Sequence, residues 1–411
     1  MSELRGACII GQSGGPTAAI NASALGVIRT ALRADCITKV LGAAHGIKGV
    51  LSGQLYDMGQ EDPKELELLK YTPSSELGSC RYKLADPNVD ETEYKKILDV
   101  FKKYDVRYFF YNGGNDSMDT CNKISKFMQK VGYECRIIGV PKTIDNDLNG
   151  TDHCPGFGSA AKYIATTCME VHRDAHVYDT GMVTVIEIMG RHAGWLAGSA
   201  GLATWAGYGP DLIYLPETDF DKKQFLDSVY EIYQKTGKCM VAVSEGIHYA
   251  DGSYVSEAEV SSTDGFGHHQ LGGLACMLAN AVKMEFGIKV RGIELSLLQR
   301  CAAHVASQTD IDEAVMAGQF AVEAATAGYT DKMVAFHRSM EDGTYECKMV
   351  LQPLDIVANL EKKVPRSWIN EAGNGVTQEF IDYVLPLIQG DLTMPREHSL
   401  PRLAKLKKIF V

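Results

Sequence analysis

The sequence lacks the features that mark several common classes of protein. It has no CxxC pair and no zinc-type cysteine spacing, and its 11 cysteines cannot all pair because their number is odd. We therefore expect reduced and mostly buried thiols, as in a reducing compartment. No run approaches the roughly 20 apolar residues that span a bilayer, and the N-terminus lacks the apolar core of a signal peptide. These absences predict a cytoplasmic protein.

An excess of positive charge is also absent. The chain of 411 residues has 41 Lys and Arg against 52 Asp and Glu, which gives a formal net charge of −11. This balance disfavours nucleic acid and anionic membranes as partners. A small anionic substrate stays open, because a local basic pocket can form within an acidic protein. The length exceeds that of one ordinary domain and favours two packed domains.

Short apolar runs do recur along the chain, and Gly, Pro, Ser or Asn residues close them. They are rich in β-branched or aromatic residues, and amphipathic helical patterns lie between them. The runs cover residues 7–10, 107–111, 136–140, 182–188 and 240–243. This alternation predicts an α/β fold whose parallel strands are buried on both faces. No internal repeat is visible, and residues 265–269 (GFGHH) are expected to form an exposed loop.

Two glycine-rich motifs follow predicted strands, where the ligands of such sheets bind. Residues 11–17 read GQSGGPT, and a helix is expected from about Thr17. The glycines let backbone N–H groups approach an anion, and the helix N-terminus adds a positive dipole end. Residues 113–117 read GGNDS and repeat this plan, whereas no Walker A loop is present. Each motif alone also fits a plain turn, but together they could face a polyphosphate.

A third motif carries the strongest chemical signal. Residues 141–147 read PKTIDND, so two carboxylates alternate with an amide beside a lysine. Asp145 is a candidate general base for a hydroxyl nucleophile, and Asp147 is a candidate metal-binding or orienting group. An Asx-rich surface turn is the structural alternative. Later motifs are MGRHAGW at 189–195, SEG at 244–246 and LLQR at 297–300, where arginine suits a sugar phosphate and glutamate suits sugar hydroxyls.

In this order and at these separations, the motifs resemble those of the phosphofructokinases. The set also includes LGSCR at 77–81 and extends from residue 7 to about residue 300. The resemblance implies two Rossmann-like three-layer αβα domains with the active site between them. Residues 1–138 plus about 308–352 would form the phosphoryl-donor domain. Residues 139–307 plus about 353–411 would form the sugar-phosphate domain.

The resemblance also implies a role for each motif residue. Asp145 would accept the proton of the sugar 1-hydroxyl, with Lys142 as the second catalytic residue. The phosphoryl donor would contact Gly14, Gly15, Arg81, Asp116 and Ser117. Fructose 6-phosphate would contact Thr143, Ile144, Asp147, Met189, Gly190, Arg191, Glu245, Leu297 and Arg300. Mg²⁺ would lie at Asn115, where many relatives have aspartate, so that its binding would lean on Asp145, Asp147 and the phosphates.

Further expectations follow from the same resemblance. They are a homodimer or homotetramer, and a reversible reaction in glycolysis or gluconeogenesis. A second phosphate-binding arginine is not assigned by the motifs, and Arg338 is a candidate for it.

The phosphoryl donor depends on two positions. ATP-using relatives typically have glycine where this sequence has Asp116 and Lys142, and the pattern here is that of the pyrophosphate-dependent branch. Two like charges about 4 Å apart at an effective dielectric constant of about 20 repel by roughly 4 kcal/mol. Asp116 would therefore repel a nucleotide α-phosphate, and Lys142 would supply a cation to the transferring phosphoryl group. The sequence predicts pyrophosphate as the donor.

Three other interpretations of the sequence remain. An ATP-dependent phosphofructokinase would share the order of the motifs but would be expected to have glycine at positions 116 and 142. A diglycine-loop kinase acting on NAD or a lipid would leave the TIDND and MGR motifs unexplained. A non-catalytic regulatory subunit would be expected to lack the first aspartate of TIDND, whereas Asp145 is present.

Overall fold

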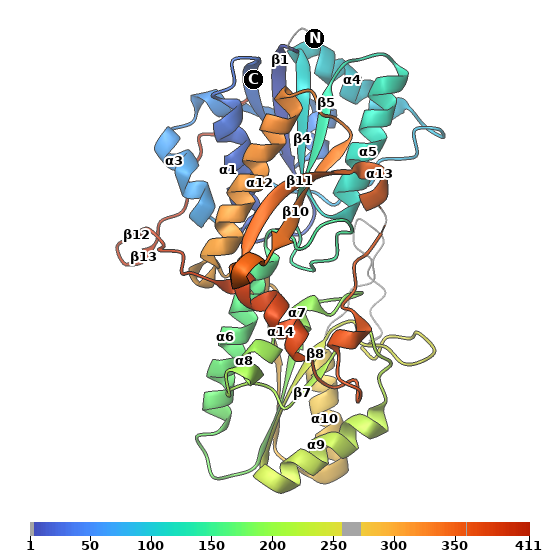
Figure 1. Ribbon diagram of the computed structural model, residues 1–411, viewed down its shortest axis with the longest axis vertical. Helices are drawn as coiled ribbons and strands as arrows, with labels where there is room; N and C mark the ends of the chain where they lie inside the picture. The colour runs from blue at the N-terminus through green and yellow to red at the C-terminus, as the bar shows by residue number, and fades with distance from the viewer. Residues whose placement is uncertain (1–3, 257–272, 359) are drawn as a thin grey trace.

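The computed structural model describes residues 4–256, 273–358 and 360–411, so the loop expected at 265–269 lies outside it. The described residues form two α/β units, one above the other in Figure 1, each built around its own sheet. The larger sheet has seven strands in the order β11-β10-β5-β4-β1-β2-β3, and the smaller has four in the order β7-β8-β6-β9. A two-strand hairpin of β12 (Arg396–Glu397) and β13 (Leu400–Pro401) completes the sheets of the described residues.

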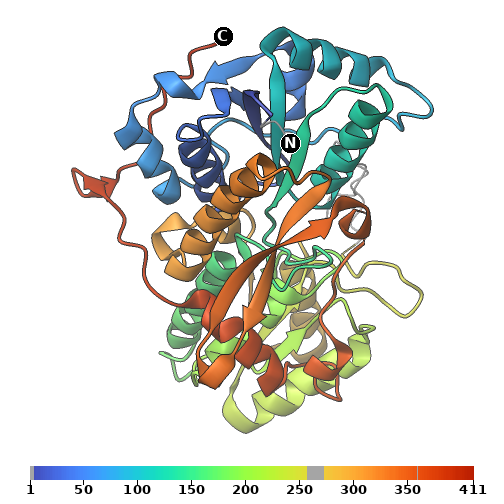
Figure 2. The ribbon, with the colours of Figure 1, turned by 45° about the horizontal axis from the view of Figure 1, so that its top comes forward.

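The larger sheet is parallel at its centre and antiparallel at its two edges, where β3 pairs with β2 and β11 pairs with β10. Its strands are β1 (Gly6–Gln12), β2 (Ile37–Ala43), β3 (Leu55–Asp57), β4 (Val106–Gly113), β5 (Arg136–Pro141), β10 (Lys332–Ser339) and β11 (Glu346–Pro353). Figure 2 shows the β10–β11 hairpin, in orange, extending beyond the sheet toward α14 (Gln378–Val384).

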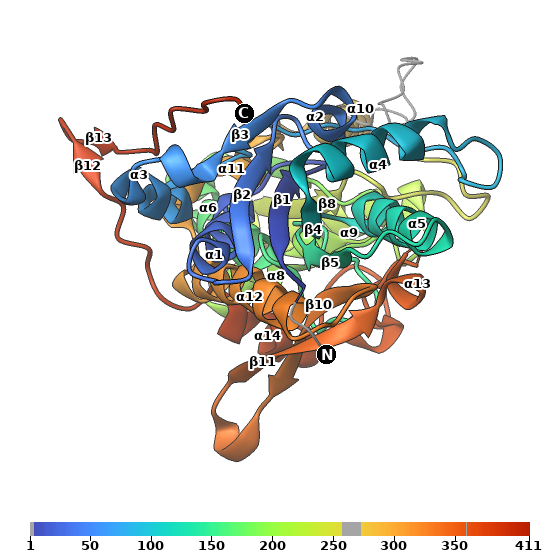
Figure 3. The same ribbon diagram turned by 90° about the horizontal axis from the view of Figure 1, so that it is seen from above.

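Helices cover both faces of the larger sheet, as the view in Figure 3 shows. Along β1, Ala7 and Ile9 pack into one core with α4 and α5, whereas Cys8 and Ile10 pack into another with α1 and α12. This alternation explains why the strand is apolar at each position from Ala7 to Ile10. The helices of this unit are α1 (Ile20–Ala31), α2 (Ile47–Ser52), α3 (Pro63–Glu67), α4 (Thr92–Tyr104), α5 (Asn115–Lys130), α12 (Gln308–Thr326) and α13 (Leu354–Val357).

Helices α1 and α12 lie unusually close together because glycine occupies their contact. A Cβ added to Gly26 would lie 2.1 Å from the Val315 carbonyl oxygen, and one added to Gly318 would lie 2.0 Å from the Ser23 carbonyl oxygen. The pair therefore joins sequence positions nearly 300 residues apart. Helix α1 begins at Ile20 rather than at about Thr17, and the Thr17 hydroxyl, just before the helix, accepts from the Ile20 N–H at 2.9 Å.

The smaller sheet is parallel throughout and also lies between two layers of helices. Its strands are β6 (Met182–Ile188), β7 (Leu212–Tyr214), β8 (Lys238–Ser244) and β9 (Val290–Glu294). Helices α6, α7, α8 and α14 pack on one face, and α9 and α10 pack on the other. The helices that complete this unit are α6 (Phe157–Ala175), α7 (Trp195–Gly198), α8 (Gly201–Trp205), α9 (Lys222–Thr236), α10 (Leu274–Phe286) and α11 (Leu298–Cys301).

The architecture confirms the predicted fold class, and all five predicted apolar runs form strands. The domain boundaries stay a proposal, and two contacts bear on them. Strand β5 belongs to the larger sheet as far as Pro141, beyond the proposed boundary at 138. The C-terminal tail also packs on that sheet, where the Val411 N–H donates to the Leu55 carbonyl at 3.0 Å. We therefore propose the same two parts with residues 139–141 and 404–411 moved to the first.

All 11 cysteines are free, and eight of them are buried. Among the described residues, no helix is both long and apolar enough to cross a membrane.

Candidate active site

One cavity of about 570 Å³ collects the loops that follow strands of both sheets. The loops after β1, β4 and β5 enter it from the larger sheet, and those after β6 and β8 enter it from the smaller sheet. Every residue that the sequence assigned to binding or catalysis lines this cavity except Gly190 and Leu297. Residues without an assigned role also line it, namely Pro16, Thr17, Gly114, His192, Ala193, Leu360 and Glu361.

Three basic side chains converge on the glycine turn after β1. The Lys142 ammonium group donates to the Gly15 carbonyl at 2.7 Å. A Cβ on Gly14, whose φ is +76°, would lie 3.3 Å from Lys142 Nζ. A Cβ on Gly15 would lie 3.2 Å from Arg300 Nη1 and 4.0 Å from Arg81 Nη2. The turn therefore brings backbone and cations together, as an anion-binding site requires.

The loop after β4 places three polar side chains in the first turn of α5. Asn115 begins this 16-residue helix, and Asp116 and Ser117 follow. The Asn115 amide nitrogen lies 3.4 Å from Asp147 Oδ2. Its Oδ1 atom is buried and has no hydrogen-bond partner within the described part of the chain. An orphaned carbonyl oxygen beside a carboxylate is a donor set suited to a hard cation.

The TIDND loop after β5 is fixed from behind by its central residue. Asn146 is fully buried with a φ of +55°. Its Oδ1 accepts from the Cys154 N–H at 3.0 Å, and its Nδ2 donates to the Tyr383 hydroxyl at 2.8 Å. Asp145 and Asp147, on either side of it, line the cavity. The amide of this motif is thus structural, and it presents both carboxylates to the site.

The charges at this loop are desolvated and only partly balanced. Burial raises the pKa of Asp145, although Lys142 and Arg191 oppose this shift. Burial and the neighbouring charge of Asp145 raise the pKa of Asp147 to about 7. Burial lowers the pKa of Lys142 to about 8, against the attraction of Asp145. Perturbations of both signs within one cavity are typical of a catalytic site that awaits charged ligands.

The smaller sheet contributes the opposite wall. The turn at Gly190 has a φ of +138°, and its carbonyl accepts from the Ser244 hydroxyl. The Gly190 N–H lies 3.4 Å from Glu245 Oε1, and burial raises the pKa of Glu245 to about 7. Gly190 therefore shapes the wall from outside the cavity lining. Leu297 stands at the N-terminal end of α11 and is 54% exposed, whereas Arg300 of the same helix lines the cavity.

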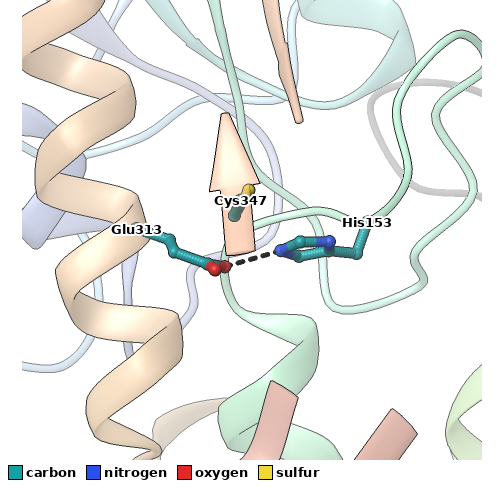
Figure 4. A group of neighbouring side chains, drawn as sticks. All are labelled: His153, Glu313 and Cys347. Carbon is teal, nitrogen blue, oxygen red and sulfur yellow. Dashed lines mark hydrogen bonds and ion pairs between the residues drawn. The ribbon is translucent and has the colours of Figure 1, made fainter. Parts of the chain in front are cut away.

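A second charged group lies behind the TIDND loop, and we call Asp152, His153, Glu313 and Arg338 the rear cluster. Asp152 Oδ2 lies 2.8 Å from His153 Nδ1. On the other side of the ring, Glu313 Oε2 lies 2.6 Å from His153 Nε2, the contact drawn as a dashed line in Figure 4. Arg338 Nε donates to Asp152 at 2.9 Å, so this arginine binds within the rear cluster and does not line the cavity.

The rear cluster also brings His153, Glu313 and the thiol of Cys347 within 4.8 Å of one another (Figure 4). Burial alone would lower the pKa of His153, but the hydrogen bonds to Asp152 and Glu313 raise it. Burial raises the pKa of the Cys347 thiol to about 12. Both imidazole nitrogens are occupied and the thiol keeps its proton, so we interpret this group as a buried imidazolium between two carboxylates.

Comparison with known proteins agrees with the geometry. The phosphofructokinase family model matches residues 7–325. The pyrophosphate–fructose 6-phosphate 1-phosphotransferase of Halomonas elongata is 46% identical over 401 residues, which cover 97% of this chain and 95% of that protein. The protein of the same name from Xanthomonas campestris pv. campestris is 46% identical over 413 residues, 99% of this chain and 97% of that one.

Solved structures agree as well. The crystal structure of the pyrophosphate-dependent phosphofructokinase from Marinobacter aquaeolei superposes with a TM-score of 0.88 at 41% identity, and the match covers 98% of this chain and 97% of that one. This chain belongs to the phosphofructokinase family.

Proposed function

We propose that this protein transfers a phosphoryl group from inorganic pyrophosphate to the 1-hydroxyl of fructose 6-phosphate, giving fructose 1,6-bisphosphate and phosphate, in a reversible reaction. The observation that carries the choice of donor is the position of Lys142. Its ammonium group lies against the glycine turn, 2.7 Å from the Gly15 carbonyl oxygen. The names of the relatives that cover nearly the whole chain support the same reaction.

The side chains that line the cavity would have different roles in such a transfer. Asp145 would take the proton of the 1-hydroxyl, because its raised pKa makes it a better base than an exposed aspartate. Lys142 and Arg81 would bind the phosphates of the donor and the leaving phosphate, and Arg300 would bind the phosphate of the sugar. Arg191 and Glu245, on the opposite wall, would bind the sugar phosphate and its hydroxyls.

The same geometry disfavours a nucleotide. Lys142 takes the space beside Gly14 and Gly15, where a glycine at position 142 would leave room. Asp116 adds a carboxylate to the cavity at the start of α5. Pyrophosphate lacks a nucleoside, so its binding must come from its phosphates, and an added lysine strengthens that binding.

The residues present fit a divalent cation, and we propose Mg²⁺. Asn115 Oδ1 is buried without a partner in the described residues, and the Asp147 carboxylate lies beside the amide. Asn115 and Asp147 would hold the ion together with phosphate oxygens, and Asp145 lies next along the loop. The bound ion would neutralise phosphate charge during transfer.

A direct assay tests the donor. The purified protein is given fructose 6-phosphate with either pyrophosphate or ATP, and fructose 1,6-bisphosphate is measured. We expect turnover with pyrophosphate and at least about 100-fold less with ATP, which corresponds to roughly 2.7 kcal/mol. Strong ATP turnover with none from pyrophosphate would refute the proposal.

A double variant tests the reason for this preference. Asp116→Gly with Lys142→Gly should raise the ratio of ATP to pyrophosphate turnover, since it removes the repelling carboxylate and the obstructing lysine. An unchanged ratio would show that these side chains do not select the donor.

Three further expectations stay predictions. The homodimer or homotetramer is checked by sedimentation, and the cytoplasmic location by fractionation of the source cells. A role in glycolysis or gluconeogenesis is checked by measuring hexose phosphates in cells that lack the protein.

A further inference from the structure

The cavity has one edge that no sequence motif predicted. Leu360 and Glu361 line it, although they follow the TIDND loop by more than 200 positions. Glu361 Oε1 lies 2.9 Å from His192 Nδ1, and both side chains line the cavity and are partly exposed to solvent, at 37% and 41%. A carboxylate and an imidazole from distant segments thus meet at the wall of the site.

The backbone on the glutamate side is firmly held. Glu361 forms an antiparallel bridge with Leu148, and the Lys362 N–H donates to the Asp147 carbonyl at 2.7 Å. The Lys362 ammonium group donates to the Thr151 carbonyl at 3.2 Å. The indole of Trp195 donates to the Lys362 carbonyl at 2.9 Å. Glu361 therefore keeps its place relative to the TIDND loop.

The histidine side is held as well. His192 follows the Gly190 turn, whose carbonyl accepts from the Ser244 hydroxyl. The neighbouring Arg191 carbonyl passes so close to Gly246 that a Cβ there would lie 1.9 Å from it. Contacts within the protein thus hold the backbone on both sides of the pair, which is what a positioning interaction requires.

We infer that His192 binds an oxygen of the transferring phosphoryl group through Nε2, and that Glu361 is a positioning residue that holds its ring. This inference rests on the proposed function. A carboxylate on Nδ1 fixes the ring orientation, and with it the direction of Nε2, the nitrogen that would meet the phosphoryl oxygen. His192 lines the same cavity as Asp145, the proposed base, so the ring faces the space where the reacting hydroxyl would bind.

Two substitutions of His192 separate the roles of its nitrogens. The amide nitrogen of asparagine reaches only the position of Nδ1, whereas that of glutamine reaches the position of Nε2. We expect His192→Asn to lower kcat by about 10- to 100-fold, the value of one charge-assisted hydrogen bond. His192→Gln should keep most of kcat, and the KM for fructose 6-phosphate should change less than about twofold in both.

Glu361→Gln should lower kcat by about fivefold, because the ring loses its charged partner. The double variant Glu361→Gln with His192→Asn should be no slower than His192→Asn alone, since Glu361 would act only through the histidine. The melting temperature of each variant, measured by differential scanning fluorimetry, shows whether it folds. Equal kcat losses in His192→Asn and His192→Gln would overturn the inference, as would additive losses in the double variant.

A control pair lies outside the cavity. His248 Nδ1 is 3.8 Å from Asp219 Oδ1, with similar exposure of the imidazole at 31%. His248→Asn should leave kcat unchanged.

Mn²⁺ binding, measured by electron paramagnetic resonance, should be the same in wild type and Glu361→Gln. Weaker binding only in Glu361→Gln would make this residue a metal ligand and overturn the inference. Wild type without pyrophosphate-dependent turnover would refute the proposed function, whereas an active wild type with a fully active His192→Asn would refute only the inference.

Discussion

The segment that follows β5 carries two groups of charged side chains, and they differ in how their charges are balanced. At its start, Lys142, Asp145 and Asp147 face the cavity, and burial raises the pKa of both carboxyl groups. A few residues on, burial would raise the pKa of Asp152, but hydrogen bonding to His153 and the charge of Arg338 lower it. The carboxylates at the start of this loop are therefore only partly compensated by nearby positive charge, whereas Asp152 is compensated by its basic partners.

This difference in charge balance matches two different roles, ligand binding at the cavity and stabilisation of the loop by the rear cluster. The rear cluster ties the loop to α12 through Glu313 and to β10 through Arg338, with every charge paired. The cavity side leaves carboxylates and a lysine for ligands of opposite charge to complete. A site that binds phosphates and a cation gains affinity from such partly balanced charges, whereas a scaffold gains stability from paired ones.

The largest expected effect comes from a substitution on the cavity side of the loop. Asp145→Asn should lower kcat by about 10²- to 10⁴-fold, because it removes the proposed base. The melting temperature should not fall, since an ionised carboxylate that is desolvated by burial is removed. Steady-state kinetics and calorimetry on one preparation measure both quantities. If Asp145→Asn lost stability but kept its turnover, the cavity side would serve stability rather than catalysis, and the comparison would be wrong.

The next largest effect is a loss of stability from a substitution in the rear cluster. Glu313→Ala leaves the buried His153 and the hydroxyl of Tyr345, which donates to Glu313 at 2.7 Å, without this partner. We expect the free energy of unfolding to fall by about 3 kcal/mol, as for other broken buried pairs. Urea denaturation at pH 7 measures it.

Glu323→Ala, at an exposed position of the same helix, is the matched control and should cost no more than about 0.5 kcal/mol. Equal losses in Glu313→Ala and Glu323→Ala would show that the rear cluster contributes no stability.

The smallest effect is a dependence on pH. The folded-state pKa of His153 is raised above the ordinary value of 6.5, because Asp152 and Glu313 outweigh the effect of burial. Its contribution to stability is therefore complete below about pH 6.5 and is lost as the pH rises through the raised value. The difference in unfolding free energy between wild type and His153→Gln should shrink as the pH rises, by less than the effect of Glu313→Ala. Denaturation at several pH values tests this, and a difference that grows with pH would contradict the assignment of an imidazolium.

The local pattern of the sequence predicted the strands that position the site. The five apolar runs are continuous and closed by turn residues, and each loop that follows a run among β1, β4, β5, β6 and β8 enters the cavity. Strands β2 and β9 were not predicted, because they carry exposed polar residues, such as Lys39 and Arg291, among the apolar ones. Their pairing with buried neighbours, rather than their own composition, makes them strands.

The sequence by itself determined which chemical groups the protein carries and that they follow strands, because a motif and its strand are neighbours along the chain. Tertiary structure alone decided which distant groups meet. The bond between His153 and Glu313 spans 160 positions, and that between His192 and Glu361 spans 169. No local periodicity encodes such a contact, since it exists only after two sheets and the C-terminal segments have packed together. The TIDND loop and its carboxylates could therefore be predicted from the sequence, whereas the rear cluster and the proposed positioning pair could not.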